Sequence, residues 1–400
     1  MIGVDELLAL ILAEVEPLRP IRHLIDLVIG SVLAGDLVAV DPLPPFTNSA
    51  MDGFAIRRVD RERVASFRVV DDLAAGHESD RQIAGGEAAR IATGAMLPAG
   101  ADAVVPIELA TVRGDHVSFQ GKSPPHGHVR AAGEDVAVGT ILARSGDRLT
   151  PALACVAMAA GVRAAWVVPI PRVGIITTGD ELVALNAPLA LASVRDVNAA
   201  FLASAVAALG MAPVDLGRSP DNPDAIGAAI STRVGGLDAI VVAGGLGPGP
   251  RDVVVEAISR LGTARAFHVA MRPGKAFAFG QVRNLPIFGV PGNPGATLAA
   301  FHALVVPSLR ALAGRPPHAP EVHAMLTTDV PNDGGRRTYL RVTLSWDGPT
   351  LMATPTGRHG SGLISDLAAA DAFLVIPSDR STARSGTALP ILPLTPLGGF

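Results

Sequence analysis

The feature that most constrains the fold is a regular alternation of strand-like and helix-like segments in the second half of the chain. Short β-branched runs lie at 173–177, 214–216 and 239–243, and helical patterns lie at 199–209, 223–234, 253–261 and 295–312. Strands that alternate with helices pack as a parallel sheet with helices on both faces. We therefore predict a doubly wound α/β domain over residues 169–315.

The segments on either side of this domain have different sequence patterns. Helical patterns occupy 6–15, after a predicted N-cap at Asp5, continue to about Leu37 and return at 151–161. Residues 42–130 consist of short β-prone pieces separated by Gly, Pro and Asp, which predicts a small β-rich domain. Prolines 316, 317 and 320 form a stiff linker, and the alternating segments after them predict a small all-β domain.

Composition excludes several classes of protein. The 400 residues carry 33 basic and 37 acidic side chains, a net charge of -4, which argues against coating nucleic acid or an anionic membrane. The one cysteine, Cys155, cannot form an internal disulfide and is expected in the core, and residues 1–20 begin with acidic rather than basic residues, so we predict a cytoplasmic protein. The uncharged stretches 197–214 and 284–309 are interrupted by Gly or Pro and are predicted to be buried core.

Four unusual loops mark one end of the predicted sheet, where ligands of open α/β domains bind. They are Thr178-Gly179-Asp180-Glu181, Gly244-Gly245 through Asp252, Arg272-Pro273-Gly274-Lys275, and Pro291-Gly292-Asn293-Pro294. Glycines allow close approach of the backbone, helix N-termini favour anions, and Arg272 and Lys275 add positive charge. Each loop alone is explained by a tight turn, and the loop after Gly244 fits neither a Walker sequence nor a dinucleotide motif. Together they predict a site for a phosphorylated ligand.

Charged side chains in these loops suggest further roles. Asp180, Glu181 and Asp252 could hold Mg²⁺, which takes one or two carboxylates plus phosphate oxygens and water, although Asp180 or Asp252 could equally cap a helix. Lys275 is one of only two lysines among 33 basic residues, which favours a need for a compact ammonium group there.

Motifs from most of the chain also occur in the order of one known family. They are Asn48-Ser-Ala-Met-Asp-Gly53, Thr93-Gly-Ala, Gly133-Glu-Asp135, Thr178-Gly-Asp-Glu-Leu182, Pro273-Gly-Lys275 with Phe277-Ala-Phe-Gly280, Pro291-Gly-Asn-Pro294, and Gly357 through Leu363. With them the chain resembles the molybdopterin molybdenumtransferases of the MoeA type, which are related to the E domain of gephyrin.

The resemblance implies a multidomain α/β protein with four parts. These are a discontinuous helical linking domain (1–41 and 131–168), a β-rich domain (42–130), an α/β molybdopterin-binding domain (169–315) and a C-terminal β-barrel (319–400). It also implies a homodimer whose active site joins the α/β domain of one protomer to the second domain of the other. Possible further partners are other cofactor-biosynthesis proteins and the apo-enzymes that receive the cofactor.

The same resemblance implies a reaction and its residues. The family inserts molybdate into adenylylated molybdopterin with Mg²⁺ while AMP leaves. By position, Asp52, Thr93 and Asp135 would belong to the second-domain side of the site, and Glu181, Asp252 and Lys275 to the α/β side. Glu181 and Asp252 would hold Mg²⁺, and Lys275 would neutralise the pyrophosphate or molybdate.

Three positions differ from the family pattern. Thr47 stands where an Asp is usual, Arg272 and Ala276 flank Pro-Gly-Lys where Lys and Pro are usual, and Gly244-Gly-Leu-Gly-Pro-Gly249 lacks a serine hydroxyl. Two other functions therefore stay open: a non-catalytic pterin-nucleotide binder or scaffold, and a nucleotide pyrophosphatase.

Overall fold

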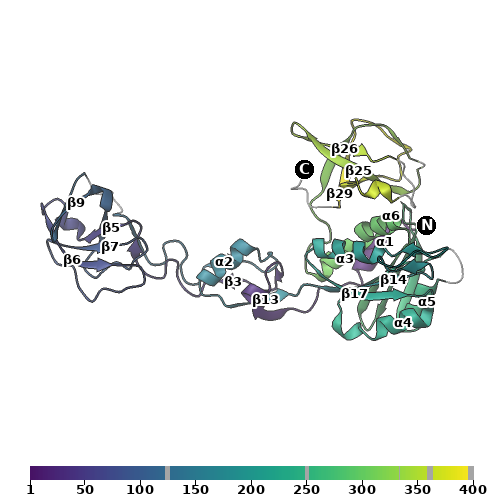
Figure 1. Ribbon diagram of the computed structural model, residues 1–400, viewed down its shortest axis with the longest axis horizontal. Helices are drawn as coiled ribbons and strands as arrows, with labels where there is room; N and C mark the ends of the chain where they lie inside the picture. The colour runs from purple at the N-terminus through teal and green to yellow at the C-terminus, as the bar shows by residue number, and fades with distance from the viewer. Residues whose placement is uncertain (122–126, 248–251, 333, 358–363, 395–400) are drawn as a thin grey trace. The chain divides into compact units, whose positions relative to one another are not determined.

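The computed structural model describes residues 1–121, 127–247, 252–332, 334–357 and 364–394 (Figure 1). The chain forms two compact units: unit 1 contains Met1–Ile21, Gly30–Val32 and Val167–Phe400, and unit 2 contains Arg22–Ile29 and Leu33–Trp166. Residues 122–126, 248–251, 333, 358–363 and 395–400 lie outside the described residues, and they include part of the glycine loop after Gly244 and most of the motif from Gly357 through Leu363. The four-domain boundaries given above stay a prediction.

The α/β part of unit 1 is built on a six-stranded sheet. Its order is β17 (Ala212–Ser219), β14 (Arg172–Thr178), β18 (Ala239–Ala243), β22 (Leu285–Val290), β21 (Ala276–Val282), β19 (Thr263–His268). The first four strands are parallel, and the prediction for the alternating segments is confirmed; β21 and β19, which lie outside that alternation, are antiparallel. The reason is the two-residue turn at Arg283 and Asn284, whose φ angles of 51° and 67° suit a tight hairpin.

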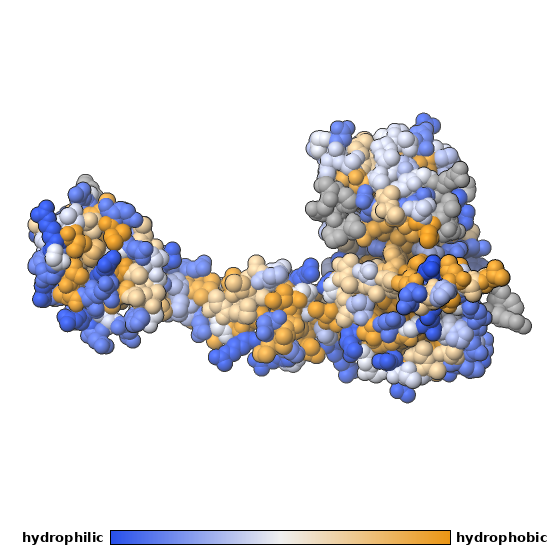
Figure 2. Space-filling model, viewed as in Figure 1, coloured by the Kyte–Doolittle hydropathy of each residue, from blue (hydrophilic) through white to orange (hydrophobic). Residues whose placement is uncertain are grey.

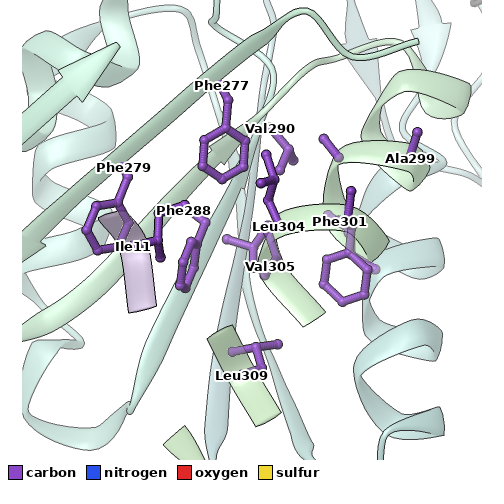
Figure 3. Close-up of a cluster of buried hydrophobic side chains, with 14 of the residues drawn as sticks. Ile11, Phe277, Phe279, Phe288, Val290, Ala299, Phe301, Leu304, Val305 and Leu309 are labelled. Atoms are coloured by element: carbon purple, nitrogen blue, oxygen red, sulfur yellow. The ribbon is translucent and has the colours of Figure 1, made fainter. Parts of the chain in front are cut away.

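Helices cover both faces of this sheet, as the alternation predicted. One apolar cluster joins Val173 and Ile175 to residues of α1, α3 and α6 to α7, and another joins Ile176 and Val242 to residues of α4 and α5. The helices are α1 (Val4–Leu12), α3 (Asn198–Ala208), α4 (Pro223–Ser231), α5 (Val253–Ser259), α6 (Pro294–Ala300), the π-helical η5 (Phe301–Val305) and α7 (Val306–Leu312). Figure 3 shows the first cluster, in which Ile11 of α1 lies beside Phe279 and Phe288 of the sheet.

One helix among the described residues, Pro294–Leu312, is long and apolar enough to span a bilayer by length and composition. Its apolar window is 78% buried inside the protein. It is therefore a core helix, in agreement with the prediction for residues 284–309.

The N-terminal segment differs from the prediction. The predicted N-cap was Asp5, but the N-cap of α1 is Gly3 and the helix begins at Val4. It ends at Leu12. The predicted continuation of helix to Leu37 was wrong, because the chain forms β1 (Ile21–Leu24), a 3₁₀ turn (Ile25–Leu27), β2 (Val32–Leu33) and β3 (Leu37–Val38). Pairing of β3 with β12 (Ile141–Ala143), about a hundred residues away, overrides the local helical pattern.

The C-terminal part of unit 1 is a small closed β-barrel. Strands follow the order β25 (Arg337–Asp347), β26 (Thr350–Pro355), β23 (Val322–Leu326), β29 (Ala388–Pro393), β27 (Ala372–Ile376), and β27 pairs back with β25. A short strand from the α/β part, β20 (Met271–Arg272), pairs in parallel with the start of β25. The remaining short pairs in unit 1 are β15 (Leu182–Val183) with β16 (Val194–Arg195), and β24 (Val330–Pro331) with β28 (Thr382–Ala383).

Unit 2 contains the β-rich region predicted for its middle. Its main sheet has the order β8 (Ala103–Pro106), β5 (Gly53–Ile56), β7 (Glu87–Ile91), β6 (Phe67–Leu73), β10 (His116–Phe119), β9 (Ala110–Arg113). Unit 2 also contains β4 (Asn48–Ser49) paired with β11 (Val129–Arg130), helix α2 (Pro151–Ala159), and the part of strand β13 (Ala164–Val168) up to Trp166.

Cys155 lies on α2 and is exposed, so the prediction that it is a core residue was wrong. The helix is apolar on every side, and its core contacts are made by Ala154 and Ala157. An apolar sequence alone could not show which of these side chains faces the core.

Candidate functional site

Three of the four predicted loops meet at one edge of the α/β sheet. Strands β14, β18 and β22 are adjacent and parallel, so the segments after Thr178, Ala243 and Val290 leave the sheet side by side. The amide of Gly244 donates to the carbonyl of Val290 at 3.0 Å, which ties two of these loops together. The prediction that these loops share one end of the sheet is confirmed.

The fourth loop, Arg272-Pro273-Gly274-Lys275, reaches this edge by a different route. Unlike the other three loops, it leads into a strand of the sheet: it precedes β21, which runs antiparallel to β22 and so starts where β22 ends. Gly274 lies close to α6, since a Cβ there would be 3.2 Å from the carbonyl oxygen of Ala296. The start of an antiparallel strand therefore lies at the same edge of the sheet as the ends of the parallel strands.

The glycines of this edge allow backbone to pack on backbone. Gly244 has a φ of 107°, and a Cβ at this position would lie 2.1 Å from the carbonyl oxygen of Thr178. Gly292 lies against Gly244, with its virtual Cβ 3.4 Å from the Gly244 Cα. Larger residues at Gly244 would push the first two loops apart.

Thr178 and Asp180 hold the first loop in place. The Thr178 hydroxyl donates to the Asp221 carboxylate at 2.8 Å, and the Asp221 amide donates to the Asp180 carboxylate at 3.1 Å. Glu181 is exposed, and its carboxylate lies over Gly179, 2.7 Å from where a Cβ would be. Glu181 is thus more available to a ligand than Asp180.

Asp252 is the N-cap of α5, as the alternative reading of this residue proposed. Its Oδ1 accepts from the Val255 amide at 3.2 Å. Burial raises the pKa of the Asp252 carboxyl despite this hydrogen bond, and a nearby cation would favour the ionised form. Pro248 to Arg251, which complete the glycine loop, lie outside the described residues.

Within the described part of the chain, no three His, Cys, Asp or Glu residues lie close enough together to hold a metal. Mg²⁺ characteristically takes one or two carboxylates and fills its shell with phosphate oxygens and water. The half-buried Asp252 and the exposed Glu181 are donors of the right kind for such a shell. Assignment of Mg²⁺ to this pair stays a prediction.

A cavity of about 520 Å³ lies beside the Lys275 loop, within unit 1. One wall is the loop Arg272 to Lys275 with Pro291 and Asn293, and the other is the start of β25. The second wall adds Arg336 and Arg341, which the sequence analysis missed. Arg341 is only 6% exposed and forms an ion pair with Asp366 at 3.9 Å. Four of the described residues that line the cavity are basic and none is acidic.

A second set of predicted residues lies in unit 2. Asp52 accepts from the amide and the hydroxyl of Thr93, at 2.7 and 3.0 Å, and these hydrogen bonds hold the pKa of the Asp52 carboxyl below its usual value. Asp135 is exposed on a separate turn, where its amide donates to the carbonyl of Leu43 at 3.0 Å. The structure thus joins Asp52 to Thr93 directly.

Three known protein regions together match nearly the whole chain. The MoeA N-terminal region (domain I and II) matches residues 2–161, a probable molybdopterin binding domain matches 174–311, and the MoeA C-terminal region (domain IV) matches 323–394. Molybdopterin molybdenumtransferase 2 of Mycobacterium tuberculosis is 34% identical over 94% of this chain and 96% of its own. The chain belongs to the molybdopterin molybdenumtransferase family. Its members are named as transferases, and the resemblance seen in the motifs is confirmed.

Other relatives agree with this membership. The molybdopterin molybdenumtransferase of Bacillus subtilis is 32% identical over 90% of this chain and 86% of its own. The crystal structure of a molybdopterin biosynthesis MoeA protein from Pyrococcus horikoshii has a TM-score of 0.82 and 28% identity, covering 99% of this chain and 100% of that one. The α/β domain and the closed barrel therefore follow the architecture of the molybdopterin molybdenumtransferases.

Two departures from the family pattern have local explanations. The Thr47 hydroxyl accepts from the amide of Ala132 at 3.2 Å, so a residue with an acceptor oxygen is retained at this position. Leu246 packs against the apolar cluster under β18 and α5, so the altered glycine loop keeps an apolar anchor. Thr47 and Leu246 thus each keep a contact with the rest of this molybdopterin molybdenumtransferase homologue.

Proposed function

We propose that this protein inserts molybdate into adenylylated molybdopterin with release of AMP, in a Mg²⁺-dependent reaction of molybdenum cofactor biosynthesis. The observation that carries the proposal is the positively charged cavity of unit 1, at the edge of the sheet where the glycine loops meet. A pterin nucleotide and molybdate are both anionic, and such a cavity suits both. Family membership supplies the reaction class.

The cavity side chains would bind and orient the anions. Lys275 and Arg272 stand on one wall and Arg336 and Arg341 on the other, so an oxyanion between them would be contacted from two sides. Fixed cations of this kind stabilise charge that develops as a phosphoanhydride breaks. The close packing of Gly244, Gly245 and Gly292 on neighbouring residues would hold the loops at the edge of the sheet that faces the nucleotide.

Glu181 and Asp252 would hold Mg²⁺ when it is bound. The ion would polarise the phosphoanhydride that joins the pterin phosphate to AMP. The proposed metal-binding role of Asp252 can be separated from its role as a helix cap. In Asp252→Asn the side-chain amide oxygen could still accept the hydrogen bond from the Val255 amide.

We further propose a homodimer in which Asp52, Thr93 and Asp135 of one protomer complete the site of the other. Exposed apolar side chains on the α2 part of unit 2 support association with a second copy, and Figure 2 shows hydrophobic residues on that surface. Val38 and Ile141, which are cross-strand partners, are 38% and 45% exposed, and Met158 and Trp166 are 47% and 54% exposed. Light scattering should give a mass of two chains, and Val38→Asp with Ile141→Asp should give one.

The decisive experiment measures AMP release from adenylylated molybdopterin by the purified protein with Mg²⁺, with and without molybdate. Release that requires molybdate and is lost in Lys275→Ala supports the proposal. Tight binding without release would identify a binding or scaffold protein, and release without molybdate would identify a pyrophosphatase. Cytoplasmic location, recipient apo-enzymes and other biosynthetic partners stay predictions.

A further inference from the structure

The segment Ile2–Asp5 contacts residues that are adjacent in sequence to both walls of the charged cavity. On one side Ile2 forms a parallel bridge with Val269: its amide donates to the carbonyl of His268 at 2.8 Å, and its carbonyl accepts from Ala270 at 2.8 Å. The amide of Val269 in turn donates to the carbonyl of Lys275 at 2.7 Å. Ile2 therefore supports residues 268–270. This segment precedes the Lys275 loop and binds its last residue through Val269.

On the other side Asp5 binds Arg337 of β25. The two carboxylate oxygens accept from the two terminal nitrogens of the guanidinium at 2.7 and 2.6 Å, which is a bidentate pair. This pairing lowers the pKa of the Asp5 carboxyl. Arg337 stands between Arg336 and Thr338, both of which line the cavity, and its amide donates to the carbonyl of Ala270 at 2.9 Å. Asp5 thus fixes the strand that carries the arginine wall.

The segment has a rigid anchor. Leu7 and Ile11 of α1 have no exposed surface, and Ile11 is packed in the core cluster of unit 1 (Figure 3). Asp5 itself is 76% exposed, and an exposed ion pair adds little to overall stability. A bidentate contact at this place constrains geometry more than it stabilises the fold.

We propose that Ile2–Asp5 is a positioning element for the anion cavity, in which the Asp5–Arg337 pair reinforces the β20–β25 backbone pairing that holds the Lys275 loop beside the arginines of β25. This inference rests on the proposed function only in treating the cavity as the oxyanion site. Asp5 and Arg337 act through the cavity wall and are positioning residues. Loss of the pair leaves the fold intact and weakens oxyanion binding.

The test is equilibrium binding of molybdate to the full-length protein by titration calorimetry. Asp5→Asn and Arg337→Lys should each weaken binding roughly 2- to 30-fold. The double variant should bind no more weakly than the weaker single variant, because both changes remove one contact. Glu6→Gln is the matched control: it removes a neighbouring exposed carboxylate from the first turn of α1 and should leave binding unchanged.

Three results would overturn the inference: wild-type affinity in Asp5→Asn, an equal loss of affinity in Glu6→Gln, or no molybdate binding by the wild type. Melting temperatures identify a folding defect, and Asp5→Asn decides the question if Arg337→Lys does not fold. The positioning role and the proposed reaction can be refuted independently of each other. A protein that binds molybdate in an Asp5-dependent manner but releases no AMP would refute the reaction and keep the positioning role.

Discussion

Substitution Gly244→Ala tests whether the backbones of the first two loops pack as closely as the structure shows. The new Cβ would lie 2.1 Å from the carbonyl oxygen of Thr178, a backbone atom that cannot rotate away, and Ala would also have to adopt a φ of 107°. The left-handed backbone costs about 1–2 kcal/mol and the overlap about 1–3 kcal/mol more. We therefore expect a loss of roughly 2–5 kcal/mol in the free energy of unfolding.

Gly217→Ala is the matched control for this variant. Gly217 has a φ of 85°, but a Cβ there would meet no atom within 4 Å, so only the backbone cost of about 1–2 kcal/mol applies. Urea unfolding followed by circular dichroism compares the two variants, and AMP release measures the effect on the site. We expect Gly244→Ala to be the less stable protein and to lose at least about tenfold in activity, since displaced loops misplace the ligand. Equal stability of the two variants would refute the close approach of Gly244 to Thr178.

Two further predictions concern titratable side chains. Asp252→Asn should keep the helix cap and change the free energy of unfolding by under about 0.5 kcal/mol, while reducing activity and its response to Mg²⁺. Asp252→Ala should in addition lower the free energy of unfolding by about 1 kcal/mol. Full activity in Asp252→Asn would exclude a role in metal binding. Burial lowers the pKa of His302 to about 4, so the unfolded chain, with a pKa near 6.5, binds the extra proton as pH falls, and stability is lost from about pH 6.5 downward. Between pH 8 and 5 the loss of stability is at most about 2 kcal/mol, and hydration of the partly exposed edge of the ring reduces it. This loss should be absent in His302→Phe. An equal dependence of stability on pH in the two proteins would contradict the prediction.

The fold was predictable wherever one segment carries a complete local signal. Strand β18 matches its predicted bounds because Ala239–Ala243 is a short apolar run buried on both faces, and α3 to α5 lie within one to three residues of their predicted bounds. The segment that continues to about Leu37 was predicted as helix but forms short strands and a 3₁₀ turn, and the partner strand of β3 lies about a hundred residues away in sequence. Local patterns cannot report such pairing.

The candidate site was predictable only in part for the same reason. Loops at the ends of β14, β18 and β22 follow from the parallel order, but the Lys275 loop reaches them through an antiparallel strand. Arg336 and Arg341 were missed because they belong to another domain of unit 1. A signal was present, since three arginines fall within six residues, 336–341, of a chain in which only 18% of residues are charged.

The most direct test of the central claim is the molybdate dependence of AMP release by the wild-type protein and by Lys275→Ala. The proposed function predicts release from adenylylated molybdopterin that requires both Mg²⁺ and molybdate in the wild type and falls by at least about a hundredfold when the cavity loses this cation. Equal release with and without molybdate, or undiminished release by Lys275→Ala, would contradict it.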